Sequence, residues 1–110
     1  MNQLIRATIL GTIAQIAMVV AGHFVPAVAN LFAIGGMGIS ALAGWAALKG
    51  QPASISAAAG SGALAGGISA AIGIAVSVAL GDVPTSLLAL GTGSSAVTGL
   101  IGGLIGRRRV

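Results

Sequence analysis

The sequence holds few side chains that could carry out acid–base or metal chemistry. Asp82 is its only acidic residue, His23 is its only histidine, and cysteine is absent. One carboxylate cannot supply the pair of acid and base groups that many hydrolases need, and one imidazole does not make a metal site of three ligands. Serine is plentiful, but the G-x-S-x-G pattern that positions a nucleophilic serine is missing. We therefore expect no enzyme activity, no metal and no cofactor.

His23 and Asp82 nevertheless form one candidate polar site, because each lies at a predicted turn on the same side of the molecule. A His–Asp pair there could sense protons or bind an ion. Alternatively, both are solvated turn residues. In that case Asp82, in the sequence Gly81-Asp82-Val83-Pro84, accepts hydrogen bonds from the free N–H groups of the next helix.

The composition points to lipid as the surrounding solvent. Of the 110 residues, 56% are hydrophobic and 5% are charged, whereas soluble domains carry about 25% charged residues. The net charge of +4 does not indicate nucleic acid as a partner, since aromatic residues make up 3% and tyrosine is absent. The first partner that we expect is the lipid bilayer.

Four segments have the roughly 20 apolar residues that a membrane-crossing helix needs. The sequence therefore predicts an all-α integral membrane protein, a four-transmembrane-helix bundle in a single membrane domain, residues 1–110. The first segment also has features of a secretory signal peptide, but we expect it to remain as a span. The predicted segments are Ile5–Phe24, Pro26–Leu48, Ile55–Leu80 and Pro84–Ile105.

The cations predict the orientation of these spans. Arg6, Lys49 and the run Arg107, Arg108 and Arg109 all fall on one side of a four-span chain. Positive residues stay in the cytoplasm, so we expect both termini to be cytoplasmic, in a bacterial inner membrane. The arginine run could also bind anionic lipid or a partner. Trp45 lies one helical turn before Lys49 and is predicted to anchor the interface.

A weak internal repeat suggests two tandem helical hairpins. A shift of 58 residues aligns Val25-Pro26 with Val83-Pro84 and Gly44 with Gly102. The hairpins would comprise residues 1–50 and 59–108. A chain rich in Ala, Gly, Leu and Val also matches itself by chance, so a duplication and a chance match both remain open.

Small residues recur at every fourth position of the last two segments. Apolar helices in lipid associate through close backbone contact, and small residues permit it. We therefore predict helix packing through a set of small residues: Ser61, Ala65, Ser69, Gly73, Ser77, Gly91, Ser95, Gly99 and Gly103. Gly36, Ser40 and Gly44 form a shorter row of the same kind in the second segment.

Gln15 and Asn30 are the polar residues that call for an explanation within the first two segments. Gln15 could line a pore, or its amide could bond a serine or a backbone carbonyl of a neighbouring helix. Asn30 could line a vestibule or satisfy a nearby turn.

The absence of charge within the spans favours one of two functions. Ionisable groups inside the membrane usually mark a transport path, so we favour a structural or assembly subunit that binds other membrane subunits or copies of itself. The alternative is a homo-oligomeric pore or small transporter, since hydroxyl and backbone groups can line a path. Its candidate lining residues are Gln15, Ser94, Ser95 and Thr98.

Overall fold

Helices make up nearly all of this computed structural model, which describes residues 2–29 and 32–109. The prediction of an all-α chain is confirmed. β-Structure within the described residues is limited to one isolated bridge between Pro52 and Arg108. In order along the chain, the elements are α1 (Asn2–Phe24), α2 (Pro26–Ala29), α3 (Phe32–Leu48), α4 (Ile55–Ala79) and α5 (Ser86–Gly106).

Three of the helices are long and apolar enough to cross a membrane, namely Gln3–Phe24, Ile55–Ala79 and Ser86–Gly106. Within the second predicted segment, Pro26–Leu48, the structure describes the single turn of α2 and the 17-residue α3, which lie on either side of residues 30–31. Pro26 begins α2, as expected of a residue whose missing N–H suits the first helical position. Asn30, a candidate polar residue of the sequence, lies outside the described residues.

The turns follow local sequence signals. Gly50 and Gly81 have φ values of 71° and 78°, a region that residues with a Cβ seldom adopt. Ser54 caps α4, because its side chain accepts a hydrogen bond from the Ala57 N–H at 3.1 Å.

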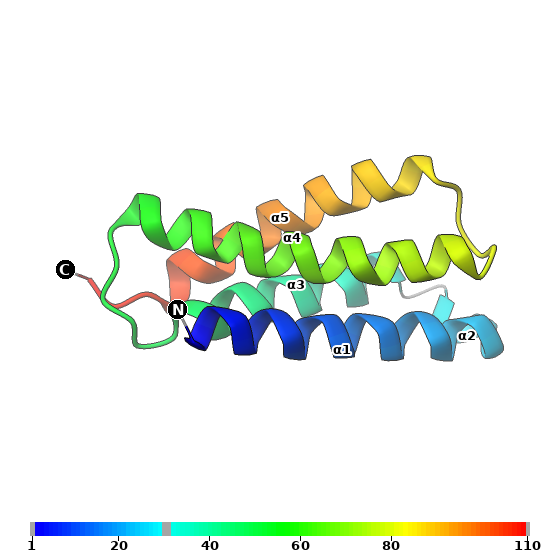
Figure 1. Cartoon of the computed structure of the whole chain (residues 1–110), viewed down its shortest axis with the longest axis horizontal. Coiled ribbons are helices and arrows are strands. Elements are labelled where there is room, and N and C mark those ends of the chain that lie inside the picture. Colours follow the sequence, from blue (N-terminus) through cyan, green and yellow to red (C-terminus); the bar gives the residue numbers. More distant parts are fainter. Residues whose placement is uncertain (1, 30–31, 110) are drawn as a thin grey trace.

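The four long helices run side by side in a bundle that measures 45 × 21 × 20 Å (Figure 1). A length of 45 Å matches a bilayer with its headgroup layers. Helix α4 packs against α1, α3 and α5, and α3 packs against α1 and α5, whereas α1 and α5 occupy opposite corners. The described ends of the chain and the α3–α4 loop lie at one end, the terminus end (Figure 1). The α1–α2 and α4–α5 turns lie at the other, the cavity end (Figure 1).

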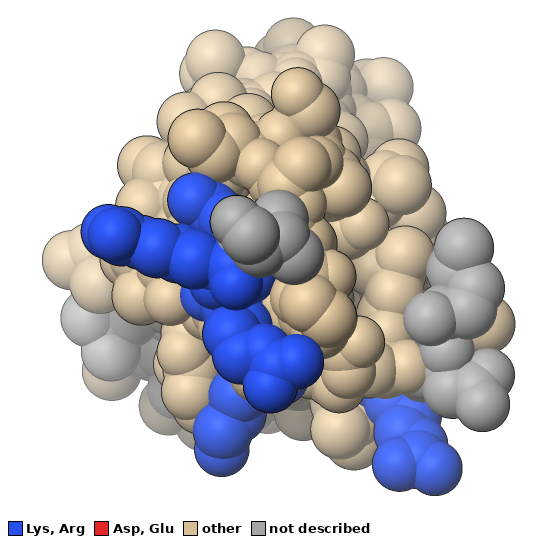
Figure 2. Space-filling model, turned by 90° about the vertical axis from the view of Figure 1, so that its left-hand side faces the viewer, with Lys and Arg blue, Asp and Glu red and all other residues tan. Residues whose placement is uncertain are grey.

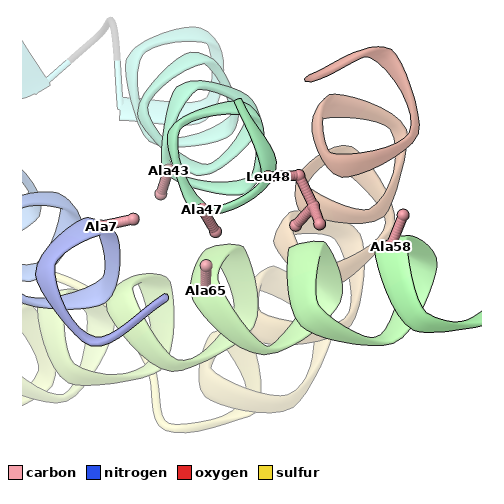
Figure 3. Packing of buried hydrophobic residues seen from close by; sticks show 6 residues of the cluster. All are labelled: Ala7, Ala43, Ala47, Leu48, Ala58 and Ala65. Atoms are coloured by element: carbon pink, nitrogen blue, oxygen red, sulfur yellow. The ribbon is translucent and has the colours of Figure 1, made fainter. Parts of the chain in front are cut away.

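The interior contains small side chains, and the bulky ones point outward. Figure 3 shows the buried cluster, in which Ala7 of α1 approaches α3 and α4. The largest fully buried side chains are those of Ser40 and Ser69. By contrast, Leu10 is 65% exposed and Ile105 is 72% exposed. This distribution leaves an apolar outer surface of the kind that faces lipid. The members of the cluster are Ala7, Ala43, Ala47, Leu48, Ala58 and Ala65.

Helix α4 uses two adjacent rows of small residues for two different neighbours. The predicted row faces α1: a Cβ on Gly73 would lie 2.7 Å from Gln15 Cβ, and Ser69 lies against Gly11. The second row was missed by the sequence analysis. Its members Gly62 and Gly66 lie directly against the backbone of α5 at Gly99.

The α3–α5 contact is equally close, and Gly44 and Gly102 permit it. A Cβ on Gly44 would overlap the carbonyl oxygen of Gly99, and one on Gly102 would overlap that of Ala41. The predicted row on α5 does face α4, because Gly99 and Gly103 both meet Gly62. Backbone-to-backbone contact of three helices therefore closes the terminus end of the bundle.

Candidate binding cavity

A cavity of about 460 Å³ lies between the four long helices in the half of the bundle toward the cavity end. Small-molecule sites typically measure about 300–1,000 Å³. All four long helices and the α4–α5 turn contribute to its wall. The lining residues are Gln15, Met18, Val19, Gly36, Met37, Ala70, Ile74, Ser77, Val83, Leu87, Leu90, Gly91, Ser94 and Ser95.

The cavity exists because α4 and α5 cross rather than run parallel. They are closest at the Gly62, Gly66 and Gly99 contacts and separate toward the α4–α5 turn (Figure 1). Beyond the crossing, the Ile74 side chain fills the space between them, so that a Cβ on Gly91 would lie 2.5 Å from Ile74 Cδ1. Because α4 and α5 cross at these glycine contacts, the two helices are close at the terminus end and apart at the cavity end.

Gln15, which lines the cavity, is bonded to α3, and Ser40 extends these bonds to α4. The Gln15 amide Nε2 donates to the Gly36 carbonyl at 3.0 Å and to Ser40 Oγ at 3.1 Å. Ser40 Oγ in turn donates to the Gly66 carbonyl at 3.2 Å. These bonds tie α1, α3 and α4 together beside the glycine contact. Gln15 therefore bonds a serine and a backbone carbonyl of a neighbouring helix, which was one of its two predicted roles. It also lines the cavity.

The lining carries hydroxyl and amide groups but no charge among the described residues. Gln15, Ser94 and Ser95, three of the residues predicted to line a path, line this cavity. Thr98 does not, and its hydroxyl donates to the Ser95 carbonyl of its own helix. Ser77 was predicted as a packing residue. It is 2% exposed, borders the cavity, and its Oγ has no hydrogen-bond partner within the described part of the chain.

His23 and Asp82 meet at the cavity end. His23 Nδ1 lies 3.0 Å from Asp82 Oδ1 and 2.9 Å from Oδ2, and the two side chains are 34% and 28% exposed. Of the two alternatives for these residues, the one in which Asp82 caps the next helix is not found. Thr85 occupies the cap position of α5 without a side-chain bond, and the Asp82 carboxylate binds His23 instead. The pair joins the end of α1 to the turn that carries the lining residue Val83.

We expect the His23–Asp82 pair to contribute little to stability at neutral pH. A double-mutant cycle of His23→Ala and Asp82→Ala, followed by unfolding in mixed micelles, should give a coupling energy of about 0.2–1 kcal/mol because the pair is partly exposed. A coupling energy above about 2 kcal/mol would mean that the pair stabilises the fold strongly and does not behave as a surface ion pair.

Basic side chains gather at the terminus end (Figure 2). Lys49 Nζ lies 4.9 Å from the centroid of the Trp45 ring, and Trp45 is 36% exposed. The arginine run is attached to the α3–α4 loop: Arg107 Nη1 donates to the Ala53 carbonyl, and the Arg108 N–H donates to the Gln51 carbonyl. The Gln51 amide bonds Gln3 Oε1 of α1 at 2.6 Å. The polar groups of this end therefore connect the arginine run, the α3–α4 loop and the start of α1.

No known protein family, curated protein or solved structure matches the chain. Within the described residues, no group of three His, Cys, Asp or Glu side chains is placed to hold a metal ion.

Proposed function

We propose that the protein is a non-catalytic membrane protein with four spans and both termini in the cytoplasm of a bacterium. Helices α1, α4 and α5 have the length and hydropathy of spans, and α2 with α3 would form the fourth, over Pro26–Leu48. The exposed aliphatic side chains support insertion into a membrane, and the basic terminus end supports this orientation. The two proposed hairpins, residues 1–50 and 59–108, would pair α1 with α3 and α4 with α5, and the helices of each pair are in contact.

Within the membrane, the function best supported is that of a small transporter of the carrier type, which holds one uncharged molecule in the cavity. The observation that carries this proposal is the convergence of Gln15, Ser94 and Ser95 on one apolar space. Pockets that bind small molecules are mostly apolar with a few polar groups. The glycine contacts at the terminus end leave a space that is closed on one side, as in one state of a carrier.

The role as a structural or assembly subunit is the second candidate, and a separate observation supports it. Gly38, Gly60 and Gly93 lie within helices, and a Cβ at any of them would meet nothing within 4 Å. Glycine costs about 1 kcal/mol in a helix relative to alanine. Such positions suit the approach of a helix from another subunit or a second copy of this chain.

Native mass spectrometry of the protein, solubilised gently from its own membrane, separates the two functions. A carrier should retain a bound non-protein mass on one or more 10.4 kDa chains. Ala70→Phe, which places a bulky ring in the cavity wall, should remove that mass. Ala75→Phe on the exposed face of the same helix should not. Other polypeptides in fixed ratio, without bound mass, would favour the assembly subunit and contradict the carrier.

A further inference from the structure

The cavity has a mouth that faces sideways, between α3 and α5. The most exposed lining side chains are Leu90 of α5, at 70%, and Met37 of α3, at 39%. On the opposite wall, Gln15 is 3% exposed, Ala70 is 2% exposed and Ser77 is 2% exposed. Among the described residues, the wall formed by α1 and α4 is therefore closed, and the wall formed by α3 and α5 carries the most exposed lining side chains.

In each of the other three pairs of neighbouring helices, a side chain packs closely against a glycine of the facing helix. Met18 fills the gap between α1 and α3, since a Cβ on Gly35 would lie 2.8 Å from Met18 Sδ. Gln15 closes the gap between α1 and α4 against Gly73, and Ile74 closes that between α4 and α5 against Gly91. In a chain that spans the bilayer, the α3–α5 mouth opens toward lipid rather than toward water.

The charges of the molecule exclude an anionic occupant. All Lys and Arg residues belong to the terminus-end sequences: Arg6, Lys49, Arg107, Arg108 and Arg109. At the cavity end, the described ionisable groups are His23 and Asp82, which bind each other. A phosphate or carboxylate headgroup would therefore enter without a counter-charge, which is costly in an apolar site.

Ser77 marks where a polar group of the occupant would lie. It is close to the end of α4 at Ala79, and its buried Oγ lacks an acceptor among the described residues. A buried hydroxyl without a partner costs free energy that a ligand oxygen can recover. In a chain that spans the bilayer, the end of α4 lies near the headgroup layer. The lipid atoms at that depth are hydroxyl, ether and ester oxygens rather than chain methylenes.

We propose that the cavity binds a single-chain lipid with an uncharged, oxygen-bearing headgroup, which enters from the bilayer between α3 and α5 and accepts a hydrogen bond from Ser77. The chain lies along Met18, Ile74, Leu87 and Leu90. This inference rests on the proposed function, because it names the class of molecule that the carrier holds. It adds the route of entry and the polar contact.

The test uses a monoacylglycerol with a diazirine in its chain, added to the full-length protein in nanodiscs and activated by light. Cross-links mapped on the intact chain should fall on the cavity side of α4 and α5. Ala70→Phe should reduce them at least tenfold, and Ala75→Phe should leave them unchanged. Equal labelling of both variants would show that the probe labels the outer surface of the protein from the surrounding lipid and not from the cavity. That result would overturn the inference.

A second pair of variants keeps the test valid if Ala70→Phe fails to fold. Leu90→Trp places a large side chain at the exposed mouth, where it disturbs no buried contact, and should reduce labelling several-fold. Ile101→Trp, at another exposed position of the same helix, should not. Equal labelling here would show that the α3–α5 gap is not the entrance.

Ser77→Ala tests the polar contact. It should weaken binding of the monoacylglycerol about three- to tenfold, the value of one hydrogen bond. It should leave binding of a diazirine alkane of equal length unchanged. Equal weakening of both probes would assign Ser77 a packing role and remove the polar contact. A bound mass that is a water-soluble solute would overturn the lipid inference and leave the carrier proposal standing, whereas an empty cavity would contradict both.

Discussion

Gly99→Ala is expected to destabilise the protein by about 3 kcal/mol, near the upper end of the range for overpacked sites. The reason is the position of Gly99 among three helices. A Cβ there would overlap the Gly62 carbonyl oxygen and lie 2.8 Å from Gly66 Cα. Both obstacles are backbone atoms, which cannot rotate away as a side chain can. Helices α4 and α5 would have to move apart, and α3 packs on the same glycine through Gly44.

Gly93→Ala provides the matched control on the same helix. A Cβ at Gly93 would meet nothing within 4 Å, so the substitution adds a methyl group without a clash and gains helix propensity. We expect stability to rise by at most about 1 kcal/mol. Both variants should be compared by unfolding in mixed detergent micelles. Equal stabilities of Gly99→Ala and the parent chain would show that the glycine contact is not as close as the structure has it.

The fold could largely be predicted because long apolar helices leave clear sequence signals. Runs of apolar residues predicted the helical segments, and Gly50 and Gly81 marked turns that glycine makes possible. Spacing by four left two adjacent rows on α4 unresolved. The chain uses one row for α1 and the other, with Gly62 and Gly66, for α5.

The candidate site was predictable only in part. Gln15, Ser94 and Ser95 were identified because polar groups in an apolar span call for a partner. The apolar lining, such as Met18 and Ile74, gave no signal, because these residues look the same whether they face lipid, a helix or a cavity. The cavity arises from the angle at which α4 and α5 cross. That angle depends on which glycines meet, and this is a property of the packed structure.

The second large effect concerns the orientation of the chain in the membrane. Lys and Arg residues near the ends of spans set orientation, and those of this chain belong to the terminus-end sequences. Changing Arg107, Arg108 and Arg109 to Gln should leave the proposed cytoplasmic orientation of the termini in place. Arg6 and Lys49 remain at the terminus end, and no Lys or Arg lies at the cavity end to compete with them.

Moving the positive charge to the other end should then reverse or divide the orientation. Ala27→Arg, Thr85→Arg and Ser86→Arg add cations at exposed positions of the cavity end. Together with the three Gln substitutions, they place more cations there than the Arg6 and Lys49 that remain opposite. The chain has no cysteine, so Gln51→Cys in the α3–α4 loop offers a single label site. An impermeant maleimide should reach it from outside the cell only in the transferred variant.

Two results would contradict this account. Labelling of Gln51→Cys from outside in the otherwise unchanged chain would mean that the basic end is not cytoplasmic. A transferred variant that keeps its orientation would mean that the polar contacts of the terminus end, such as those that Gln3 makes with the end of α3, form early enough to override the charge rule. In the first case the cavity would face the cytoplasm, and its lipid would come from the half of the bilayer on the cytoplasmic side. The orientation therefore decides which half of the bilayer supplies the cavity.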